Sequence, residues 1–312
     1  MRIFISGSLA YDRVMGFPGK FKDHILPEKI HILNVSFTVD SLTENFGGTA
    51  GNIAYSLALL EERPIIIATA GASDFQRYQS WLEQHGLTLE GIRVVENELT
   101  AGAYITTDLS DNQITGFNPG AMKHRADYAL APSEEPSLGI VAPGNPEDML
   151  VYSRQFKELA FYTIFDPGQS IPILSAEAMV EMIEGSRMLI CNDYELAMIM
   201  KATGLDMNGL LARATSVITT LGEQGVRVNI AAEEHLIPAV PVEKVADPTG
   251  AGDAFRAGMI RGLAAGRDLI EATRMGTVCA SYAVEQRGTQ VHRFTPEEFQ
   301  ARFDGVFGPL QP

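Results

Sequence analysis

One short segment of the chain carries the residue types best suited to catalysis. Residues 247–253 read Asp-Pro-Thr-Gly-Ala-Gly-Asp, and a pattern of helical period begins directly after them. Glycines let successive backbone N–H groups converge, and the start of a helix adds partial positive charge. Such a segment can bind a phosphoryl group while it is transferred. Asp253 lies in the first helical turn, where its carboxylate could accept the proton of an attacking hydroxyl.

These residues also have a purely structural interpretation. A glycine turn followed by an acidic residue is a common way to begin a helix, because carboxylates are favourable at helix N-termini. For a generic glycine turn this interpretation is the more frequent one. Two other phosphate-binding patterns are excluded, since the segment lacks the GxxxxGK[ST] motif and Gly7-Ser8-Leu9 does not make a GxGxxG fingerprint.

The N-terminal part of the chain offers a candidate binding site for an acceptor molecule. An apolar run at residues 2–5 predicts a buried strand, and a glycine-rich turn at 47–52 leads into a helical run. Where strand and turn meet, a carboxylate could accept hydrogen bonds from two hydroxyls, a glycine could permit close approach, and an amide could donate and accept. The candidate residues are Ser8, Asp12, Gly48 and Asn52. The structural alternative for Asp12 is a solvent-facing turn residue.

The elements that must position these residues follow from the hydrophobic pattern. After residue 137, short apolar runs alternate with helical stretches, which predicts a parallel sheet covered on both faces. The predicted strands are 2–5, 64–69, 138–141, 160–165, 188–191 and 216–219, with a hairpin at 226–230 and 235–237. The predicted helices are 53–60, 74–85, 146–159, 175–184, 193–201, 251–265, 268–285 and 296–303.

Three further segments have strand character but lie outside this alternation. Residues 30–39 alternate around His31, Asn34 and Ser36 and predict a half-exposed strand. Residues 100–107 and 113–117 are rich in residues that favour strands. Together with 30–46 they predict a small accessory sheet.

Composition limits the partners of the protein. The 312 residues include 39 acidic and 24 basic side chains, giving a net charge of −15. This charge argues against nucleic-acid and anionic-membrane partners, since both need clustered Lys and Arg. No apolar run approaches the length of a membrane span, and the N-terminus does not resemble a signal peptide. The two cysteines, Cys191 and Cys279, are far apart in sequence, so we expect a cytoplasmic protein without disulfides.

The exact sequence of two motifs resembles one family. DPTGAGDAF at residues 247–255 is similar to the C-terminal signature of the ribokinase (PfkB) family of carbohydrate and nucleoside kinases, and residues 47–52 resemble its N-terminal glycine signature. The resemblance covers nearly the whole chain. It implies one kinase domain over residues 1–312, an α/β three-layer sandwich with a nine-stranded or similar sheet. A small β-sheet lid would take its strands from about 12–46 and 100–118.

The resemblance also implies roles for the motif residues. Asp253 would be the catalytic base, and Gly250, Ala251 and Gly252 would form the anion hole. The cofactors would be ATP and Mg²⁺, and a lid closing over the acceptor would keep water from hydrolysing ATP. Because lids of this family often meet a second lid, a homodimer through the lid is expected.

Two further segments match the nucleotide side of the family. Residues 192–195 resemble its NxxE motif, which implies that Asn192 and Glu195 handle phosphate and, indirectly, Mg²⁺. Taken alone, Asn192 is a helix N-cap, and the two roles can coexist. Residues 220–225 resemble the loop that holds the nucleotide, with Thr220, Gly222 and Gly225 as candidates. Many members are activated by K⁺, and Asp247 and Thr249 match that loop, although Asp247 could simply cap the turn.

Finer likeness points to bacterial adenosine kinases of this family. It is carried by FPGKF at 17–21, LPEKIH at 26–31, NVSFTVD at 34–40, FNPGAM at 117–122 and DPGQS at 166–170, the last of which makes Gln169 a substrate-binding candidate. Aromatic faces stack on bases, so Phe117 would contact adenine, with Phe37 nearby on the lid. The alternative for both rings is packing within the lid. Residues 100–104 carry small side chains where a second ring would be expected.

These observations predict an ATP-dependent kinase that phosphorylates the 5′-hydroxyl of adenosine and releases AMP and ADP. Two alternatives share the same chemistry: a sugar kinase similar to ribokinase or fructokinase, and a kinase for another nucleoside. A third is a nucleotide-binding protein without activity, but the intact Asp253 and the glycines before it argue against that class.

Overall fold

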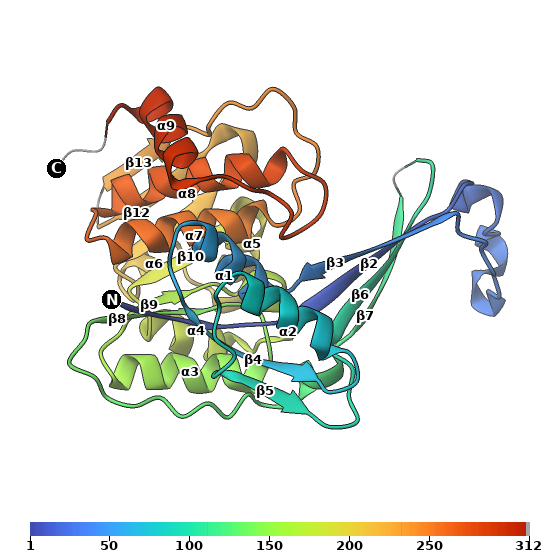
Figure 1. Cartoon of the computed structure of the whole chain (residues 1–312), viewed down its shortest axis with the longest axis horizontal. Helices are drawn as coiled ribbons and strands as arrows, with labels where there is room; N and C mark the ends of the chain where they lie inside the picture. Colours follow the sequence, from blue (N-terminus) through green and yellow to red (C-terminus); the bar gives the residue numbers. More distant parts are fainter. Residues whose placement is uncertain (111, 232, 310–312) are drawn as a thin grey trace.

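Two β-sheets of different size organise the chain, as the computed structural model shows for residues 1–110, 112–231 and 233–309 (Figure 1). The larger sheet has nine strands in the order β13-β12-β11-β10-β9-β8-β1-β4-β5. All neighbours are parallel except β11–β12 and β12–β13, which are antiparallel. Its strands are β1 (Arg2–Ser6), β4 (Ile65–Gly71), β5 (Ile92–Val95), β8 (Ser137–Val141), β9 (Tyr162–Phe165), β10 (Met188–Asn192), β11 (Ser216–Thr220), β12 (Val226–Ile230) and β13 (Glu233–Ile237).

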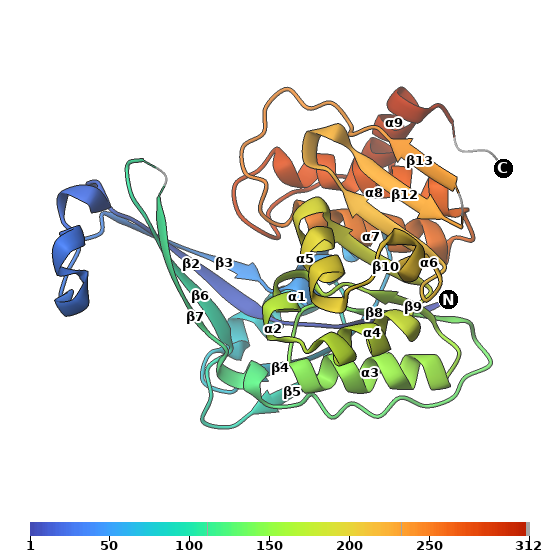
Figure 2. The same cartoon turned by 180° about the vertical axis from the view of Figure 1, so that it is seen from behind.

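Helices cover both faces of this sheet, as the two opposite views show (Figures 1 and 2). One face carries α1 (Thr49–Leu59), α2 (Phe75–Gln84), α7 (Ala251–Ala264) and α8 (Leu269–Val284), with α9 (Pro296–Phe307) packed on α8. The other face carries α3 (Pro146–Glu158), α4 (Ala176–Glu184), α5 (Asp193–Thr203) and α6 (Met207–Leu211). No helix in the described part of the chain is long and apolar enough to cross a membrane.

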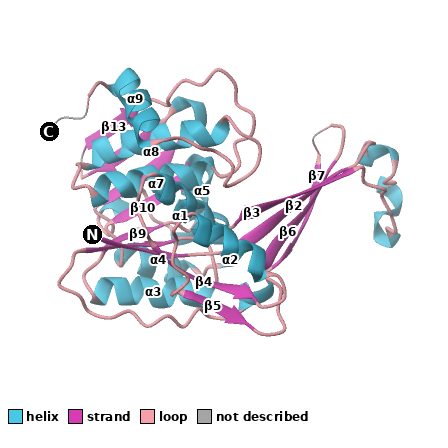
Figure 3. Ribbon diagram, in the orientation of Figure 1, coloured by secondary structure: helices cyan, strands magenta, loops and turns pink. Residues whose placement is uncertain are grey.

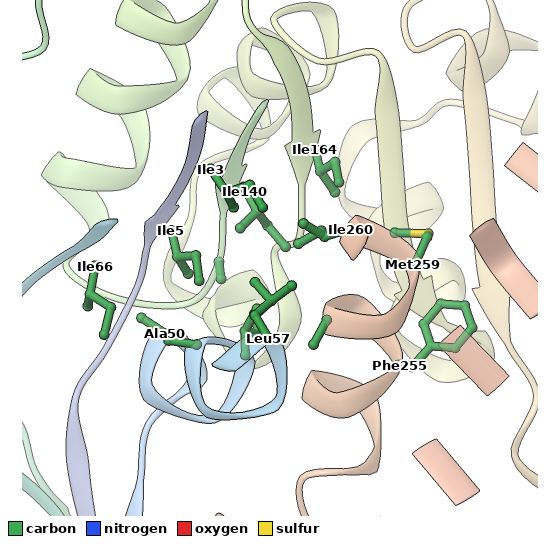
Figure 4. Packing of buried hydrophobic residues seen from close by; sticks show 14 of the residues in the cluster. Ile3, Ile5, Ala50, Leu57, Ile66, Ile140, Ile164, Phe255, Met259 and Ile260 are labelled. Carbon is green, nitrogen blue, oxygen red and sulfur yellow. The ribbon is translucent and has the colours of Figure 1, made fainter. Parts of the chain in front are cut away.

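Alternating side chains of the strands build two separate cores. In β1, Ile3 and Ile5 face the core shared with α1 and α7, whereas Phe4 faces the core on the other side. This alternation is the period-two pattern of a strand, and both faces are apolar because both are covered. In the first core, Leu57 of α1 and Ile260 of α7 meet the sheet (Figure 4). This packing fixes the positions at which both helices begin.

The smaller sheet projects from the sandwich as a lid (Figure 3). Its order is β3-β2-β6-β7, with β2 parallel to β6 and the other two pairs antiparallel. The strands are β2 (Ala10–Gly16), β3 (Ser41–Gly47), β6 (Ala101–Thr107) and β7 (Gln113–Asn118). Because β2 follows β1 after three residues, the lid is tied directly to the large sheet. Two short 3₁₀ helices, Phe21–Asp23 and Pro27–Ile32, form its outer tip.

The α/β sandwich with a β-sheet lid is confirmed, but one predicted lid strand was wrong. Residues 30–39 are not a strand: they continue the 3₁₀ helix Pro27–Ile32 and then lack regular structure. The strand β2 ends where its pairing with β3 ends, at Gly16 opposite Ser41. A segment beyond that point has no partner strand, so its alternation has no sheet to join. The sequence patterns also missed β2, β5 and α6.

Candidate active site

Several of the predicted site residues gather where strands of the large sheet end. The loops after β1, β9, β10 and β11 all leave the carboxyl ends of parallel strands, the edge at which open α/β sheets bind ligands. Asp166 follows β9 directly, while Asn192 and Thr220 are paired at the ends of β10 and β11. The N-terminus of α7 brings Asp253 to the same edge, as its electrostatic interaction with Asp166 indicates.

The first turn of α7 carries the glycines of the predicted anion hole. Gly250 precedes the helix with a φ of +79°, a left-handed conformation that glycine adopts without strain. The amide of Ala251 donates to the Pro248 carbonyl, at 3.2 Å. The amides of Gly252 and Asp253 have no acceptor among the residues that the structure describes. Amides without an acceptor at the positive end of a helix of 14 residues are an arrangement that can bind an anion.

The carboxyl of Asp253 has a raised pKa. Burial raises the pKa of its carboxyl to about 7, and the charges of Asp166 and Asp12 act in the same direction. The guanidinium of Arg256 and a hydrogen bond from Asn52 oppose this rise. The amide Nδ2 of Asn52 donates to Asp253 Oδ2 at 2.8 Å. A base whose pKa lies near neutral pH is well matched to accepting a hydroxyl proton.

A buried ion pair lies behind the base, one helical turn further along α7. The guanidinium of Arg256 donates from its second terminal nitrogen to Asp166 Oδ1 at 2.8 Å, and its Nε contacts Asp166 Oδ2. The other terminal nitrogen donates to the Gly252 carbonyl at 2.9 Å. Both side chains are buried. The pair therefore ties the first turn of α7 to the end of β9 and places a positive charge near Asp253.

Asp12 of β2 faces the same region from the lid side. Thr289 places its hydroxyl 3.3 Å from Asp12 Oδ2 and 2.7 Å from the Phe46 carbonyl oxygen. Burial raises the pKa of Asp12, which the Thr289 hydrogen bond opposes. Gly47 is required beside it, because a Cβ there would lie 2.5 Å from Asp12 Oδ2. The carboxylate is thus held at the base of the lid, partly open to solvent.

The lid register places Asp12 and Phe117 on one face. Asn45, Asp12, Ala103 and Phe117 are direct partners across β3, β2, β6 and β7. Side chains opposite one another in neighbouring strands point to the same side of a sheet. Asp12 accepts from Thr289, and a Cβ on the neighbouring Gly288 would lie 2.8 Å from Asn45 Nδ2, so this side is the one that faces the sandwich. Phe117 is 52% exposed there, with only the small Ala103 between it and Asp12.

Other acceptor candidates have structural roles in this fold. The Ser8 hydroxyl is buried and accepts a hydrogen bond from the Thr49 amide, so it holds the start of α1. Gly48, the glycine predicted to permit close approach of a sugar, also has a backbone role: its φ is +84°, and a Cβ would lie 2.5 Å from the Ser8 carbonyl oxygen. Gln169 is exposed in the 3₁₀ helix after β9. Asn52, in contrast, is joined to Asp253 itself.

Phe37 does not come together with the other candidates. Its ring packs against Phe17, Phe21 and His24, with centroids 4.7, 5.2 and 6.2 Å away. This cluster lies at the outer tip of the lid, far along β2 and β3 from Asp12 (Figure 1). The packing alternative therefore accounts for Phe37.

The nucleotide-side candidates lie at the ends of β10 and β11. Asn192 caps α5: its Oδ1 accepts from the Glu195 amide at 2.7 Å, and Glu195 Oε2 accepts from the Asn192 amide at 2.8 Å. The other carboxylate oxygen of Glu195 accepts no hydrogen bond from the residues that the structure describes. Burial raises the pKa of Glu195. Gly222 and Gly225 shape the loop after Thr220 with φ of +59° and +93°.

Asp247 braces the loop before α7. Its Oδ1 accepts from the Thr249 amide at 2.9 Å and its Oδ2 accepts from the Gly288 amide at 3.0 Å. Although burial works in the other direction, the hydrogen bonds from Thr249 and Gly288 hold the pKa of this carboxyl below its usual value. Across the described ranges, no group of three or more His, Cys, Asp or Glu could hold a metal ion. A cation here would therefore need backbone carbonyls as ligands.

Comparison with known proteins settles the family. A family model described as pfkB family carbohydrate kinase matches residues 19–295. The chain belongs to this family. The pfkB resemblance drawn from the two glycine motifs is thereby confirmed. The chain is 30% identical over 279 residues to a nucleoside kinase of Methanocaldococcus jannaschii, covering 89% of this chain and 91% of the relative.

Solved structures of the pfkB fold agree. The Burkholderia thailandensis nucleoside kinase in complex with inosine has a TM-score of 0.86 and 36% identity, covering 98% of both chains. Its complex with ADP-inosine also gives 0.86, with 37% identity over 99% of this chain and 97% of that one.

Three residues of the site escaped the sequence patterns. Arg256 follows the DPTGAGDAF motif directly, and Asp166 begins the DPGQS segment, but nothing in the sequence indicates that they pair. Gln290 lies between α8 and α9, in a segment without periodicity, and donates to Asn52 Oδ1 at 3.0 Å. The sequence signal for Arg256 and Asp166 was their position at the edge of recognised motifs. No sequence signal pointed to Gln290.

Proposed function

We propose that this chain transfers the γ-phosphate of ATP to the 5′-hydroxyl of a nucleoside, with adenosine as the acceptor and AMP and ADP as products. The observation that carries the proposal is the lid row of Asp12, Ala103 and Phe117. A carboxylate suits ribose hydroxyls, and an aromatic ring suits a base. Strands two apart in a sheet are separated by roughly 9–10 Å, which is the scale of a nucleoside.

Ala103 supports this assignment. It occupies the position between the carboxylate and the ring, where a bulky side chain would fill the space that a base needs. The small residues at 100–104 therefore fit a base pocket in which Phe117 is the one ring that stacks on the base. The Burkholderia thailandensis protein solved with inosine and with ADP-inosine is a nucleoside kinase, which supports a nucleoside as the acceptor.

The phosphate side of the proposal rests on α7. The free amides of Gly252 and Asp253 suit the transferring phosphoryl group, and Asp253 suits the acceptor hydroxyl. Glu195, with one oxygen outside its cap, fits a water molecule of a Mg²⁺ ion carried by the nucleotide. Such an ion would neutralise charge on the phosphates.

A panel of acceptors tests this function. ATP turnover by the purified chain is measured with adenosine, inosine, ribose and fructose, together with 2′,3′-dideoxyadenosine. We expect the highest kcat/KM for adenosine. The dideoxy compound should have a much lower kcat/KM, because it lacks the 2′- and 3′-hydroxyls that would donate hydrogen bonds to Asp12. Preference for inosine would assign another nucleoside as acceptor, and preference for ribose or fructose would replace the proposal with the sugar-kinase alternative.

Phe117→Ala should weaken adenosine binding and leave ATP binding unchanged. Stacking of a base on an aromatic ring is worth about 1–3 kcal/mol, which corresponds to a loss of about 5- to 150-fold in affinity. The matched control is Ile114→Ala, which removes an exposed apolar side chain from the opposite face of the same strand. Calorimetric titration of both ligands decides the matter. Equal adenosine affinity in wild type and Phe117→Ala would show that the ring of Phe117 does not contact the base.

Potassium should activate the enzyme through the loop that Asp247 braces. Asp247 joins this loop to Gly288, and carboxylate oxygens keep a second acceptor site when each receives one hydrogen bond. A cation bound there would stiffen the turn that carries the anion-binding amides. Turnover is compared in K⁺ and in tetramethylammonium at equal ionic strength. Equal rates in the two salts would exclude a monovalent-cation site.

A homodimer through the lid is the proposed assembly. The lid carries exposed apolar side chains at and near its tip: Leu26, Ile30, Ile32, Leu33, Leu42 and Leu109. Such a gathering is typical of an interaction surface. Sedimentation equilibrium should give twice the chain mass of 33.9 kDa, and Ile30→Asp with Ile32→Asp should return the monomer. A monomeric wild type at micromolar concentration would refute the assembly.

A further inference from the structure

A buried chain of hydrogen bonds connects α2 with the candidate base. The indole Nε1 of Trp81 donates to Gln290 Oε1 at 2.9 Å, and Gln290 Nε2 donates to Asn52 Oδ1 at 3.0 Å. Asn52 Nδ2 then donates to Asp253 Oδ2 at 2.8 Å. These four side chains come from α2, the segment between α8 and α9, α1 and α7. The chain therefore exists only when three helices and one loop are packed together.

Each link in this chain has only one workable direction. An indole N–H can donate but cannot accept, so Gln290 must turn its carbonyl oxygen to Trp81 and its NH₂ group away from it. That NH₂ group needs an acceptor, and Asn52 meets it with its own carbonyl oxygen. Asn52 is then left with its NH₂ group toward Asp253. The side-chain amide of an asparagine can adopt two orientations that differ by a 180° flip. The indole of Trp81 sets the orientation of Asn52 here, through Gln290.

Gln290 itself is held in an unusual state. Its φ is +57°, in the left-handed region that residues other than glycine rarely occupy, and its side chain is buried. The second proton of its amide goes to Tyr78 Oη at 2.6 Å, and Tyr78 in turn donates to the Gly47 carbonyl. Gly51 leaves the necessary room, since a Cβ there would lie 1.9 Å from Tyr78 Oη. Backbone strain that persists beside a candidate active site indicates a constrained role.

We propose that Gln290 is a positioning residue for phosphoryl transfer: by fixing the amide of Asn52, it keeps an N–H donor facing the Asp253 carboxylate. This inference rests on the proposed function, in which Asp253 is the base. The bond from Asn52 engages Oδ2, and Oδ1 has no hydrogen-bond donor within the described chain. Oδ1 is therefore the oxygen that remains for the acceptor hydroxyl.

A flipped Asn52 would have the opposite effect on the base. Its carbonyl oxygen would face a carboxylate oxygen, and only protonated Asp253 could then make a hydrogen bond. The charged groups around Asp253 are Arg256 on the same helix, Asp166 after β9 and Asp12 of the lid. Exchange of Gln290 for a neutral residue alters none of these charges, so a change in the protonation of Asp253 reports on the amide.

Gln290→Met tests the proposal, because methionine is neutral and of similar length. We expect kcat to fall about 2- to 10-fold, the loss that one hydrogen bond would give, with the KM for ATP unchanged. The rising limb of kcat/KM against pH should move to higher pH. The matched control is Tyr78→Phe, which removes the other partner of the Gln290 amide and leaves the chain from Trp81 to Asp253 intact. It should lower the melting temperature without moving the pH limb.

A double variant separates positioning from stability. Asn52→Leu removes the group through which Gln290 acts, so adding Gln290→Met to it should shift the pH limb no further. Trp81→Phe removes the donor together with one ring of the indole and leaves an aromatic ring beside Phe46, which provides a second variant if Gln290→Met does not fold. If the pH shifts of Asn52→Leu and Gln290→Met were additive in the double variant, the proposal would be overturned. It would also be overturned if Gln290→Met or Trp81→Phe lowered the melting temperature without moving the rising pH limb.

Failure of this inference and failure of the proposed function can be told apart. If the wild type phosphorylates no nucleoside, the function fails, and the protonation of Asp253 is still measurable by carbon NMR of its carboxylate. In that measurement Gln290→Met should raise the Asp253 pKa and Tyr78→Phe should not. An unchanged Asp253 pKa in Gln290→Met would contradict the positioning role whatever the acceptor.

Discussion

Asp253→Asn will lower kcat by about 10²–10⁴-fold and leave ATP affinity nearly unchanged, the size of effect that a general base supplies. The exchange is a mild one for the structure. Asparagine has the same shape, and its Oδ1 can still accept the hydrogen bond from Asn52. What it loses is the capacity to take the proton of the acceptor hydroxyl. The measurement is steady-state turnover, with ATP affinity taken from calorimetry.

The control for this variant is a second aspartate at a helix start. Asp268 is exposed, caps α8 by accepting from the Glu271 amide, and lies on a different helix from the base. Asp268→Asn should leave turnover unchanged, because asparagine and aspartate cap helices about equally well. If Asp253→Asn also left turnover unchanged, Asp253 would not be the base and would be an ordinary acidic residue at a helix start.

The same assignment has a pH signature. The base works only when ionised, and the pKa of Asp253 is raised to about 7. In the wild type, kcat/KM should therefore rise about tenfold per pH unit below pH 7 and level off above it. Asp253→Asn should lose this limb, since asparagine does not titrate.

Most of the large sheet was predictable from sequence, because its strands other than the edge strand β5 have a local sequence pattern. Strands such as β1 and β8 are short apolar runs, apolar on both faces because helices cover both. The lid was less predictable. In β2, Asp12 and Arg13 interrupt the apolar pattern, because Asp12 accepts a hydrogen bond from Thr289 on one face of the lid and Arg13 forms an ion pair with Glu44 on the other. A strand with polar partners on both faces does not show the pattern of a core strand.

Part of the candidate site was likewise predictable from sequence and part was not. The glycine motifs could be recognised because anion binding needs a fixed local sequence, and they gave Asp253 and Gly250 their roles. The partners of Asp253 could not be recognised, since each joins segments far apart in the chain. Asn52 lies 201 positions from Asp253, and Gln290 lies 238 positions from Asn52. Their roles depend on which end of an amide faces which neighbour, a property that exists only in the folded protein.

Arg256→Met should destabilise the fold by about 3–5 kcal/mol, the cost of leaving a buried charge without its partner. Arg256 is 7% exposed and Asp166 is 2% exposed, so neither can turn to water. The loss of Arg256 also removes the positive charge that opposes the raised pKa of Asp253. The rising limb of kcat/KM should consequently move to higher pH. Denaturant unfolding and a pH profile measure the two effects separately.

Two controls separate the ion pair from the side chain. Arg154 pairs with Glu181 at the surface, where both side chains are about half exposed, so Arg154→Met should cost only about 0–1 kcal/mol. The double variant Asp166→Asn with Arg256→Met should regain most of the stability, because it removes both charges and leaves none unpaired. If Arg256→Met cost no more than Arg154→Met, the first turn of α7 would have to be held at the sheet edge by its apolar packing alone. The pair would then serve only to set the charge around Asp253.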